Sequence, residues 1–272
     1  MIVDYHMHLR APDGSIDHSV EAVERFASVA AERGVDEIGF TEHVYYFRQT
    51  RELWTQSYEL ERCVYDLDRY CEAVLEAKRR GLRVKLGLEV DYVPGKEREL
   101  RDLLAPYPWD YLLGSVHRIE GHAVDQDPGV WEHLPVSEVW RRYFIALRGA
   151  VRSGLFDVLA HLDLVKIFGT RPPAEELVLH HEETADAIDA AGNVAIEVST
   201  AGLRKPVGEL YPDPGLLAAC KSRAIAVTTA SDAHQPAHVG RDVKQAAALA
   251  RGVGYETVTV FDRRKARQEP FR

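Results

Sequence analysis

Short apolar runs alternate along the chain with longer stretches in which apolar residues recur at helical spacing. The apolar runs have the length of buried strands, and they end near His8, Thr41, Glu89, His117, His161, Thr200 and Ala230. After the first run, apolar side chains three or four residues apart predict a helix over 19–33, which Gly34 ends. The chain therefore repeats a strand-then-helix pattern from its first residues.

The same pattern continues to the end of the chain. Further helices are predicted from Cys63 to Ala77 and over 97–104, 136–151, 214–222 and 236–252, with one more from Pro172-Pro173 to near Gly192. The segment 257–261 is either a last strand or an edge segment, and 45–58 is either a lid over a site or ordinary packing. About seven strands alternating with helices predict an α/β protein with a parallel sheet, and a closed or nearly closed barrel fits better than an open sheet.

Composition narrows the class of protein. The chain has 272 residues, a net charge of −9 and three cysteines without a C-x-x-C pair. The acidic balance argues against a nucleic-acid polymer as partner. No apolar run approaches the ~18 residues that a membrane span needs, and no signal peptide is seen. We therefore expect one domain over 1–272 in a reducing, cytoplasmic compartment, acting on a small molecule, with the oligomeric state left open.

Polar residues of the metal-ligand type follow the strands. In βα barrels the chemistry is carried at the carboxyl ends of several strands. Each such residue, taken alone, is often a rim histidine or a helix cap without a role in metal binding. Here that interpretation would have to hold for all of these residues together. The pairs His6/His8 and Asp232/His234, at i and i+2, can each point to one side of an extended chain. The candidates are His6, His8, Asp13, His43, Glu89, His117, His161, Asp232 and His234.

This set of residues points to phosphate-ester chemistry. Imidazoles mixed with carboxylates suit zinc, manganese or iron better than calcium or magnesium. Nine ligands are too many for one ion, whereas three ions that share a bridging carboxylate fit the number. Clustered ions polarise a phosphoryl group and lower the pKa of a bound water. The other six histidines fall in loops or helical stretches and are read as surface residues: His18, His122, His133, His180, His181 and His238.

The motifs resemble the PHP (polymerase and histidinol phosphatase) superfamily over nearly the whole chain, and most of all its stand-alone histidinol-phosphatases. The resemblance implies a distorted (β/α)7 TIM-like barrel with three metal ions. It rests on Asp4-Tyr5-His6-Met7-His8, Thr41-Glu42-His43, Gly87-Leu88-Glu89-Val90-Asp91, Asp110-Tyr111 before Gly114-Ser115-Val116-His117, Ala160-His161-Leu162-Asp163 with Leu164-Val165-Lys166, Ser199-Thr200-Ala201-Gly202-Leu203-Arg204-Lys205-Pro206 and Ser231-Asp232-Ala233-His234.

The resemblance also implies a ligand set for each ion. His6, His8, Glu89 and Asp232 would hold the first ion, and Glu89, His117 and His161 the second. The third would take His43, His234 and a residue after the first strand. There, histidinol-phosphatases of this type usually have Cys-Gly-His, whereas this chain has Asp13-Gly14. Asp13 is the expected third ligand, and the alternative is a simple turn.

Catalytic roles are assigned to His234, Asp232 and Arg204. Arg204 is the first candidate for a clamp on the phosphate, because a guanidinium matches phosphate geometry, with Arg118 and Lys166 as weaker candidates for substrate binding. Asp4 would either orient the His6 imidazole or have a structural role. The expected reaction is hydrolysis of L-histidinol phosphate in histidine biosynthesis.

Three alternatives stay open at this point. The first is a PHP phosphatase or phosphodiesterase acting on a nucleotide or another small phosphate ester, which Asp13-Gly14 favours slightly. The second is a non-catalytic PHP module associated with a polymerase. The third is an amidohydrolase-like barrel, which often uses a carboxylated lysine where Glu89 stands here.

Overall fold

Seven short parallel strands close into a barrel. The computed structural model describes residues 1–126 and 128–272, without the side chains of 130–132. Backbone bonds from Tyr5 N to Thr229 O (3.1 Å) and from His8 N to Ala233 O (2.8 Å) join the first strand to the last. The predicted barrel is confirmed. Its strands, in spatial order, are β1 (Val3–Asp4), β2 (Glu37–Phe40), β3 (Val84–Asp91), β4 (Tyr111–Ser115), β7 (Val158–Leu159), β8 (Ala195–Ser199) and β9 (Val227–Ala230).

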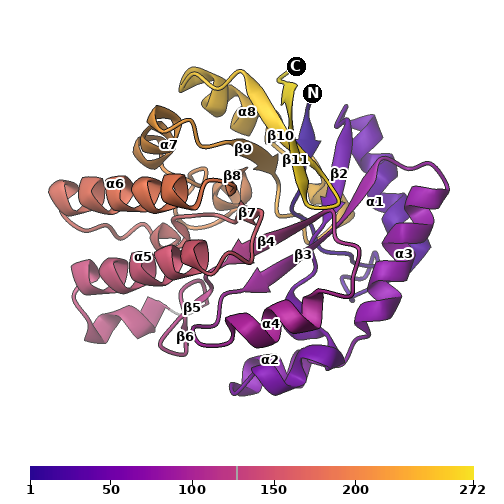
Figure 1. The fold of residues 1–272 in the computed structure, drawn as a ribbon, viewed down its shortest axis with the longest axis horizontal. Coiled ribbons are helices and arrows are strands. Elements are labelled where there is room, and N and C mark those ends of the chain that lie inside the picture. The colour runs from indigo at the N-terminus through magenta and orange to yellow at the C-terminus, as the bar shows by residue number, and fades with distance from the viewer. Residues whose placement is uncertain (127) are drawn as a thin grey trace.

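Helices surround the strands (Figure 1). The first shows why they form where they do: Ser19 caps it by accepting a hydrogen bond from Ala22 N at 3.2 Å, and its apolar side packs on the barrel through Val23 and Phe26. The helices are α1 (Val20–Glu32), α2 (Ser57–Arg62), α3 (Leu67–Arg79), α4 (Glu97–Leu104), α5 (Val136–Arg152), α6 (Ala174–Ala191), α7 (Pro214–Ser222) and α8 (Val243–Gly252). No helix of the described chain is long and apolar enough to cross a membrane.

The prediction of one helix over 236–252 is wrong. A short 3-10 turn, η6 (Pro236–His238), comes first, and α8 starts only at Val243. Between them Asp242 has a left-handed backbone with φ 60°, and Gly240 N donates to the Asp4 carboxylate at 2.7 Å. The loop after β9 is thereby fixed to β1, which breaks the helical path.

A hairpin at the end of the chain plugs the amino-terminal mouth of the barrel. It consists of β10 (Thr257–Asp262) and β11 (Lys265–Pro270), so the open question about 257–261 is settled as a strand. Phe261 stacks on Tyr111 at 5.5 Å between ring centroids, and Tyr111 stacks on Tyr5 at 5.2 Å inside the barrel. A Cβ at Gly39 would lie 2.1 Å from the Tyr111 hydroxyl, so that position needs glycine. With this end filled, the opposite end is left for a site.

The aromatic stretch after β2 packs against the fold, with Tyr45 stacked on His43 at 4.8 Å between ring centroids. It folds into the 3-10 helices η1 (Val44–Tyr46) and η2 (Arg48–Leu53), followed by α2. Tyr45, Tyr46 and Phe47 are buried, and Thr50 donates to the carbonyl oxygen of Phe47 at 2.8 Å. Trp54 is half-buried. The remaining short turns and strands are β5 (Arg118–Ile119), β6 (His122–Ala123), η3 (Pro128–His133), η4 (Leu164–Lys166) and η5 (Ala201–Arg204).

Candidate metal centre

Six histidines, one glutamate and two aspartates gather where the barrel strands end. They come from the segments after β1, β2, β4, β7 and β9 and from β3 itself. Four overlapping groups have ligand atoms that all lie within 4.8 Å of one another, which is the spacing that a metal ion requires. These groups are His8, His43 and His234; His6, His8 and Asp232; His6, Glu89 and His161; and His43, Asp91 and His117.

Glu89 lies at the middle of this cluster. Its Oε2 atom is 2.6 Å from His43 Nδ1, 3.4 Å from His6 Nε2 and 3.7 Å from His8 Nε2. Its Oε1 atom is 3.3 Å from His161 Nε2 and 3.4 Å from His117 Nε2. One buried carboxylate thus faces five imidazoles, three on one oxygen and two on the other, which is the arrangement of a bridging ligand.

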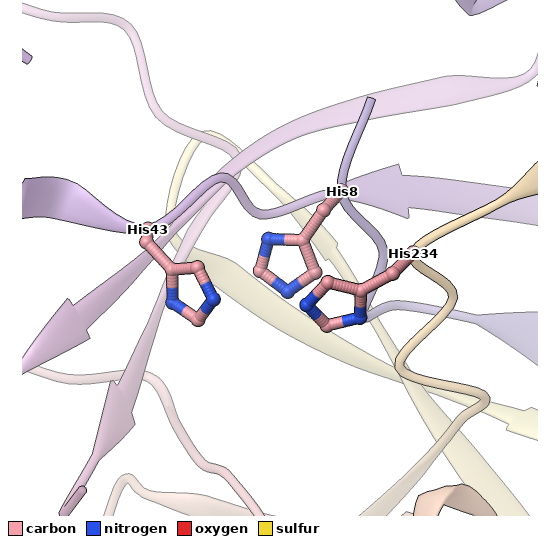
Figure 2. A group of neighbouring side chains, drawn as sticks. All are labelled: His8, His43 and His234. Atoms are coloured by element: carbon pink, nitrogen blue, oxygen red, sulfur yellow. The ribbon is translucent and has the colours of Figure 1, made fainter. Parts of the chain in front are cut away.

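Asp232 and His234 complete the side of the cluster next to β1. Asp232 Oδ1 lies 3.4 Å from His8 Nε2 and 3.6 Å from His6 Nε2. Figure 2 shows the imidazoles of His8, His43 and His234 turned toward one another from the ends of three different strands. The His234 side chain is 45% exposed, so this is the face of the centre that opens to solvent.

The backbone at two of these residues is strained. Asp232 has φ 52° and His161 has φ 22°, in the left-handed region that costs a residue with a Cβ about 1–3 kcal/mol. Such conformations persist only where the surroundings hold them, and they concentrate at functional sites. Both strained residues belong to the candidate metal-ligand groups, which is where such strain is expected.

The carboxylates and imidazoles of the centre shift one another's pKa values. Burial by itself would raise the pKa of Glu89, but positive charge on His43, His6 and His117 outweighs it and lowers that pKa well below its ordinary value. Burial would likewise lower the pKa of His117, yet Glu89 and Asp91 raise it to about 10. The carboxylates therefore demand positive charge at this place, which either imidazolium groups or metal ions can supply.

The centre fits metal ions on the evidence of its own atoms. Several buried ligand atoms have no hydrogen-bond partner within the described residues, although they face one another: His6 Nε2, both ring nitrogens of His8, His43 Nδ1, Glu89 Oε2 and Asp232 Oδ1. Buried polar atoms are rarely left unpaired in native proteins. Nitrogen and oxygen donors grouped in this way suit zinc, manganese or iron.

A second layer of carboxylates holds the imidazoles in place, and the sequence analysis missed its main member. Glu197 on β8 is fully buried; its Oε2 accepts from His6 Nδ1 at 2.8 Å and its Oε1 accepts from His161 N at 3.3 Å. Asp91 pairs with His117 Nδ1 at 2.7 Å. The bonds to His6 Nδ1 and His117 Nδ1 fix the tautomers that leave Nε2 of each ring free as a ligand. The signal for Glu197 was an acidic residue inside the apolar run Ala195–Ser199.

The structure does not bring Asp13 to the cluster. Its side chain is exposed, and its Oδ1 accepts from Ser15 N at 2.9 Å and from Ser15 Oγ at 2.6 Å. Gly14 has φ 88° and closes a turn against Ala11 O. The alternative of a simple Asx turn is therefore what this segment adopts. In the metal groups, His8 takes the place beside His43 and His234 that Asp13 was expected to fill.

The three cations expected to bind substrate lie in different surroundings. Arg204 is half-buried beside Asp232 and donates to Ser231 O and, at 3.3 Å, to Thr200 O. Arg118 donates to the Glu59 carboxylate at 2.5 Å. Lys166 is fully buried, with Nζ 2.9 Å from Asp163 Oδ2, so it is already neutralised inside the fold. Of the three, Arg204 keeps the best position for a phosphate at the centre.

The structure decides between the two roles left open for Asp4, and it corrects three of the histidines expected on the surface. Asp4 does not bond to His6; its carboxylate accepts from Ser231 N and Oγ and from Gly240 N, which holds the loop after β9. The structural alternative is therefore the one observed. His18, His180 and His181 are buried rather than on the surface. His180 stacks on Phe144 of α5 at 5.1 Å because that face of α6 packs against α5.

Known proteins resemble this chain over nearly its whole length. The model of the PHP domain family matches residues 4–201. A probable histidinol-phosphatase of Deinococcus radiodurans is 36% identical over 95% of this chain and 96% of that protein. The histidinol-phosphatase of Bacillus subtilis is 27% identical over 87% of this chain and 95% of that protein. The crystal structure of histidinol phosphate phosphatase from Lactococcus lactis, in complex with zinc, L-histidinol and phosphate, is 20% identical, covers 98% of both chains and has a TM-score of 0.76.

Proposed function

This chain belongs to the PHP domain family, and from that premise we propose that it is a metal-dependent histidinol-phosphatase, which hydrolyses L-histidinol phosphate to L-histidinol and phosphate. The observation that carries the proposal is Glu89, whose two carboxylate oxygens face five imidazoles at the open end of the barrel. The relatives from Deinococcus radiodurans and Bacillus subtilis support the substrate, and both are matched over nearly their full length.

The residues of the centre divide into three ligand sets. We assign His6, His8, Glu89 and Asp232 to one ion, and Glu89, His117 and His161 to a second. His43 and His234, with His8 beside them, would hold a third. Zinc, manganese and iron all suit these donors. When bound, the ions polarise the phosphoryl group and make a water nucleophilic at neutral pH.

The chain's own groups position the reacting parts. Glu197 and Asp91 hold the imidazoles of His6 and His117 so that Nε2 faces the centre. Arg204, anchored to the loop that carries Asp232, binds the non-bridging oxygens of the phosphate. Water replaces the alcohol at phosphorus, and the leaving oxygen takes up one proton. Of the two candidate donors of that proton, His234 and a water at the centre, the water is favoured, because desolvation and the neighbouring His8 lower the pKa of His234 well below its ordinary value.

The cysteines, the terminal hairpin and Asp13 bear on the compartment, the domain organisation and the substrate. The three cysteines are unpaired and buried, which supports a reducing compartment, and we propose the cytoplasm. We also propose that 1–272 acts as one domain, because the terminal hairpin supplies part of the interior of the barrel. The nucleotide alternative loses its ground, since Asp13 lies in a surface turn rather than at the centre.

A phosphate-release panel tests the proposal. L-histidinol phosphate, glycerol phosphate and nucleoside monophosphates are compared with added zinc, manganese or iron. We expect histidinol phosphate to give the highest kcat/KM and chelator treatment to abolish turnover reversibly. Glu89→Gln should lower kcat by on the order of 10³-fold. The matched control is Glu37→Gln on β2, whose carboxylate accepts from the Tyr5 hydroxyl away from the cluster.

Two results would count against the proposal. A wide preference for a nucleotide would overturn the substrate. Full activity of a properly folded Glu89→Gln variant would overturn the metal mechanism, because the carboxylate that faces five imidazoles would then be dispensable.

A further inference from the structure

The three ligand sets of the metal centre differ in the negative charge that they offer. The first set contains two carboxylates, Glu89 and Asp232, and the second contains Glu89 alone. The third set consists of the imidazoles of His8, His43 and His234 and has no carboxylate of its own. An imidazole binds a metal ion in its neutral form, so the third set brings no negative charge to a divalent ion.

His8 is counted in two sets, although one ring nitrogen binds one ion. Its Nε2 atom lies 3.4 Å from Asp232 Oδ1 and 3.7 Å from Glu89 Oε2, among the ligands of the first ion. Its other ring nitrogen, Nδ1, lies 3.8 Å from Oε2 of Glu42, which belongs to none of the metal groups found in the described chain. With His8 engaged by the first ion, the third ion keeps two imidazoles of its own.

These two imidazoles, of His43 and His234, approach carboxylate oxygens that are already assigned. Glu89 Oε2 lies 2.6 Å from His43 Nδ1, and Asp232 Oδ1 lies 3.4 Å from His234 Nδ1. Both oxygens also face the imidazoles of the first set, where they serve the first ion. The third ion would therefore compete for them with an ion that has more ligands.

The loop after β1 adds no ligand to this pair. Its two carboxylates are engaged elsewhere, since Asp13 accepts from Ser15 and Asp17 Oδ2 lies 2.7 Å from an Arg25 nitrogen of α1. The loop folds back on itself, with Ala11 N donating to Ser15 O at 2.8 Å. Across residues 1–126 and 128–272, the third position thus has two imidazoles and no oxygen ligand of its own.

The third position is also open to an anion from solvent. The His234 side chain is 45% exposed, whereas the ligands of the first set are buried or nearly so. Zinc takes four ligands, so two places at this ion are left for groups that the chain does not supply. Arg204 donates to Ser231 O, three residues before His234, and its guanidinium suits a phosphate on this side of the centre.

We propose that the third ion is exchangeable and that a phosphate group supplies the ligands that the chain lacks, so that this ion is retained only together with phosphate or a phosphate ester. The inference rests on the proposed function, because it concerns the same centre. The coupling is reciprocal: the third ion raises the affinity for phosphate by the factor by which phosphate raises the affinity for the ion. The first two ions stay bound without phosphate, because carboxylates belong to their sets.

Zinc content at equilibrium tests the inference without any turnover. Zinc-loaded protein is dialysed against buffers of fixed free zinc, with and without inorganic phosphate, and zinc per chain is measured by elemental analysis. Phosphate should raise the affinity for the third zinc ion about 10- to 100-fold, while the other two ions are retained in both buffers. Retention of three ions to the same extent without phosphate would overturn the inference.

His234→Ala separates the third ion from the other two. The variant should lose only the zinc that depends on phosphate, and it should bind phosphate about 10- to 100-fold more weakly. His161→Ala should instead lose zinc in the buffer without phosphate. His238→Ala is the matched control, because His238 is half-buried in the same loop after β9 and belongs to none of the metal groups in the described chain. Loss of zinc from His234→Ala without phosphate would contradict the inference.

An assay of hydrolysis tells this inference apart from the proposed function. If the wild type hydrolyses histidinol phosphate but holds three ions equally well without phosphate, the inference is wrong and the function stands. If the third ion depends on phosphate and histidinol phosphate is not hydrolysed, the function is wrong and the inference stands.

Discussion

Replacing Glu197 with glutamine tests whether the second layer of carboxylates controls the metal centre. The carboxylate accepts two hydrogen bonds with two oxygens, from His6 Nδ1 at 2.8 Å and from His161 N at 3.3 Å. Glutamine has the same shape but only one acceptor oxygen. If the amide oxygen faces His6 Nδ1, the amide NH2 is opposed to the N–H of His161. If instead the NH2 faces His6, the His6 imidazole must change its tautomer.

The change of tautomer decides the magnitude. If the amide NH2 faces His6 Nδ1, the proton moves to His6 Nε2, which points at Glu89 and Asp232 and would no longer be a ligand. Loss of such an orienting partner lowers metal affinity about 10- to 100-fold, or about 1.4–2.8 kcal/mol. We expect Glu197→Gln to lose affinity for zinc and kcat/KM by this factor.

The assay is a zinc titration of the metal-free protein, followed by kcat/KM at saturating zinc. Glu37→Gln is the control, because it removes one carboxylate from a barrel strand without touching the cluster. Wild-type zinc affinity in a folded Glu197→Gln variant would refute the reasoning, as would an equal loss in the Glu37→Gln control.

Four further predictions concern single side chains elsewhere in the structure. Arg204→Ala should lower kcat/KM and weaken inhibition by phosphate roughly 10- to 100-fold with unchanged metal content, and a large metal loss would contradict the clamp. Asp163→Asn leaves buried Lys166 with only the more distant Glu209 carboxylate at 3.6 Å and should cost on the order of 3 kcal/mol in urea unfolding; a neutral effect would refute the buried pair. Burial raises the pKa of the Cys220 thiol to about 12, so the folded state keeps a proton that the unfolded state releases above pH 9. The stability of the wild type relative to Cys220→Ala should therefore fall by about 1.4 kcal/mol between pH 8 and 10, and a constant difference would exclude it. Asp13→Asn should keep the full metal content by elemental analysis, whereas loss of one equivalent would restore the role expected from the sequence.

The barrel and most of its metal centre could be predicted because short local sequence patterns determine both. A strand that ends in His43 or His117 places that side chain at the carboxyl end of the sheet whatever the rest of the chain does. The pairs at i and i+2, such as His6 and His8, need only an extended backbone to share one side. The bridging role of Glu89 was expected from the resemblance to the PHP superfamily, because a position at a strand end does not tell which ligand two ions share.

The remaining features depend on tertiary contacts that periodicity does not contain. The sequence Asp13-Gly14 is compatible with a turn and with a metal-binding loop. Only the hydrogen bonds from Ser15 to the Asp13 carboxylate show that it forms a turn. His180 lies on a helix whose packing partner, Phe144, is 36 residues away in the sequence. Lys166 beside a ligand strand looked like a phosphate clamp, although its partner Asp163 makes it part of the interior.

The closure of the barrel between β1 and β9 also sets the order of events during synthesis. Asp232 leaves the ribosome 226 residues after His6, which takes roughly 10–45 s at about 5–20 residues per second. Until then β1 can pair with β2 but has no second neighbour, and its open edge can pair with other chains. The ligand set that contains both His6 and Asp232 can form only when the two strands that carry them meet, which is the last step of barrel closure. Glu89, His117 and His161 leave the ribosome earlier, so the ligand sets of the centre become complete at different times during synthesis.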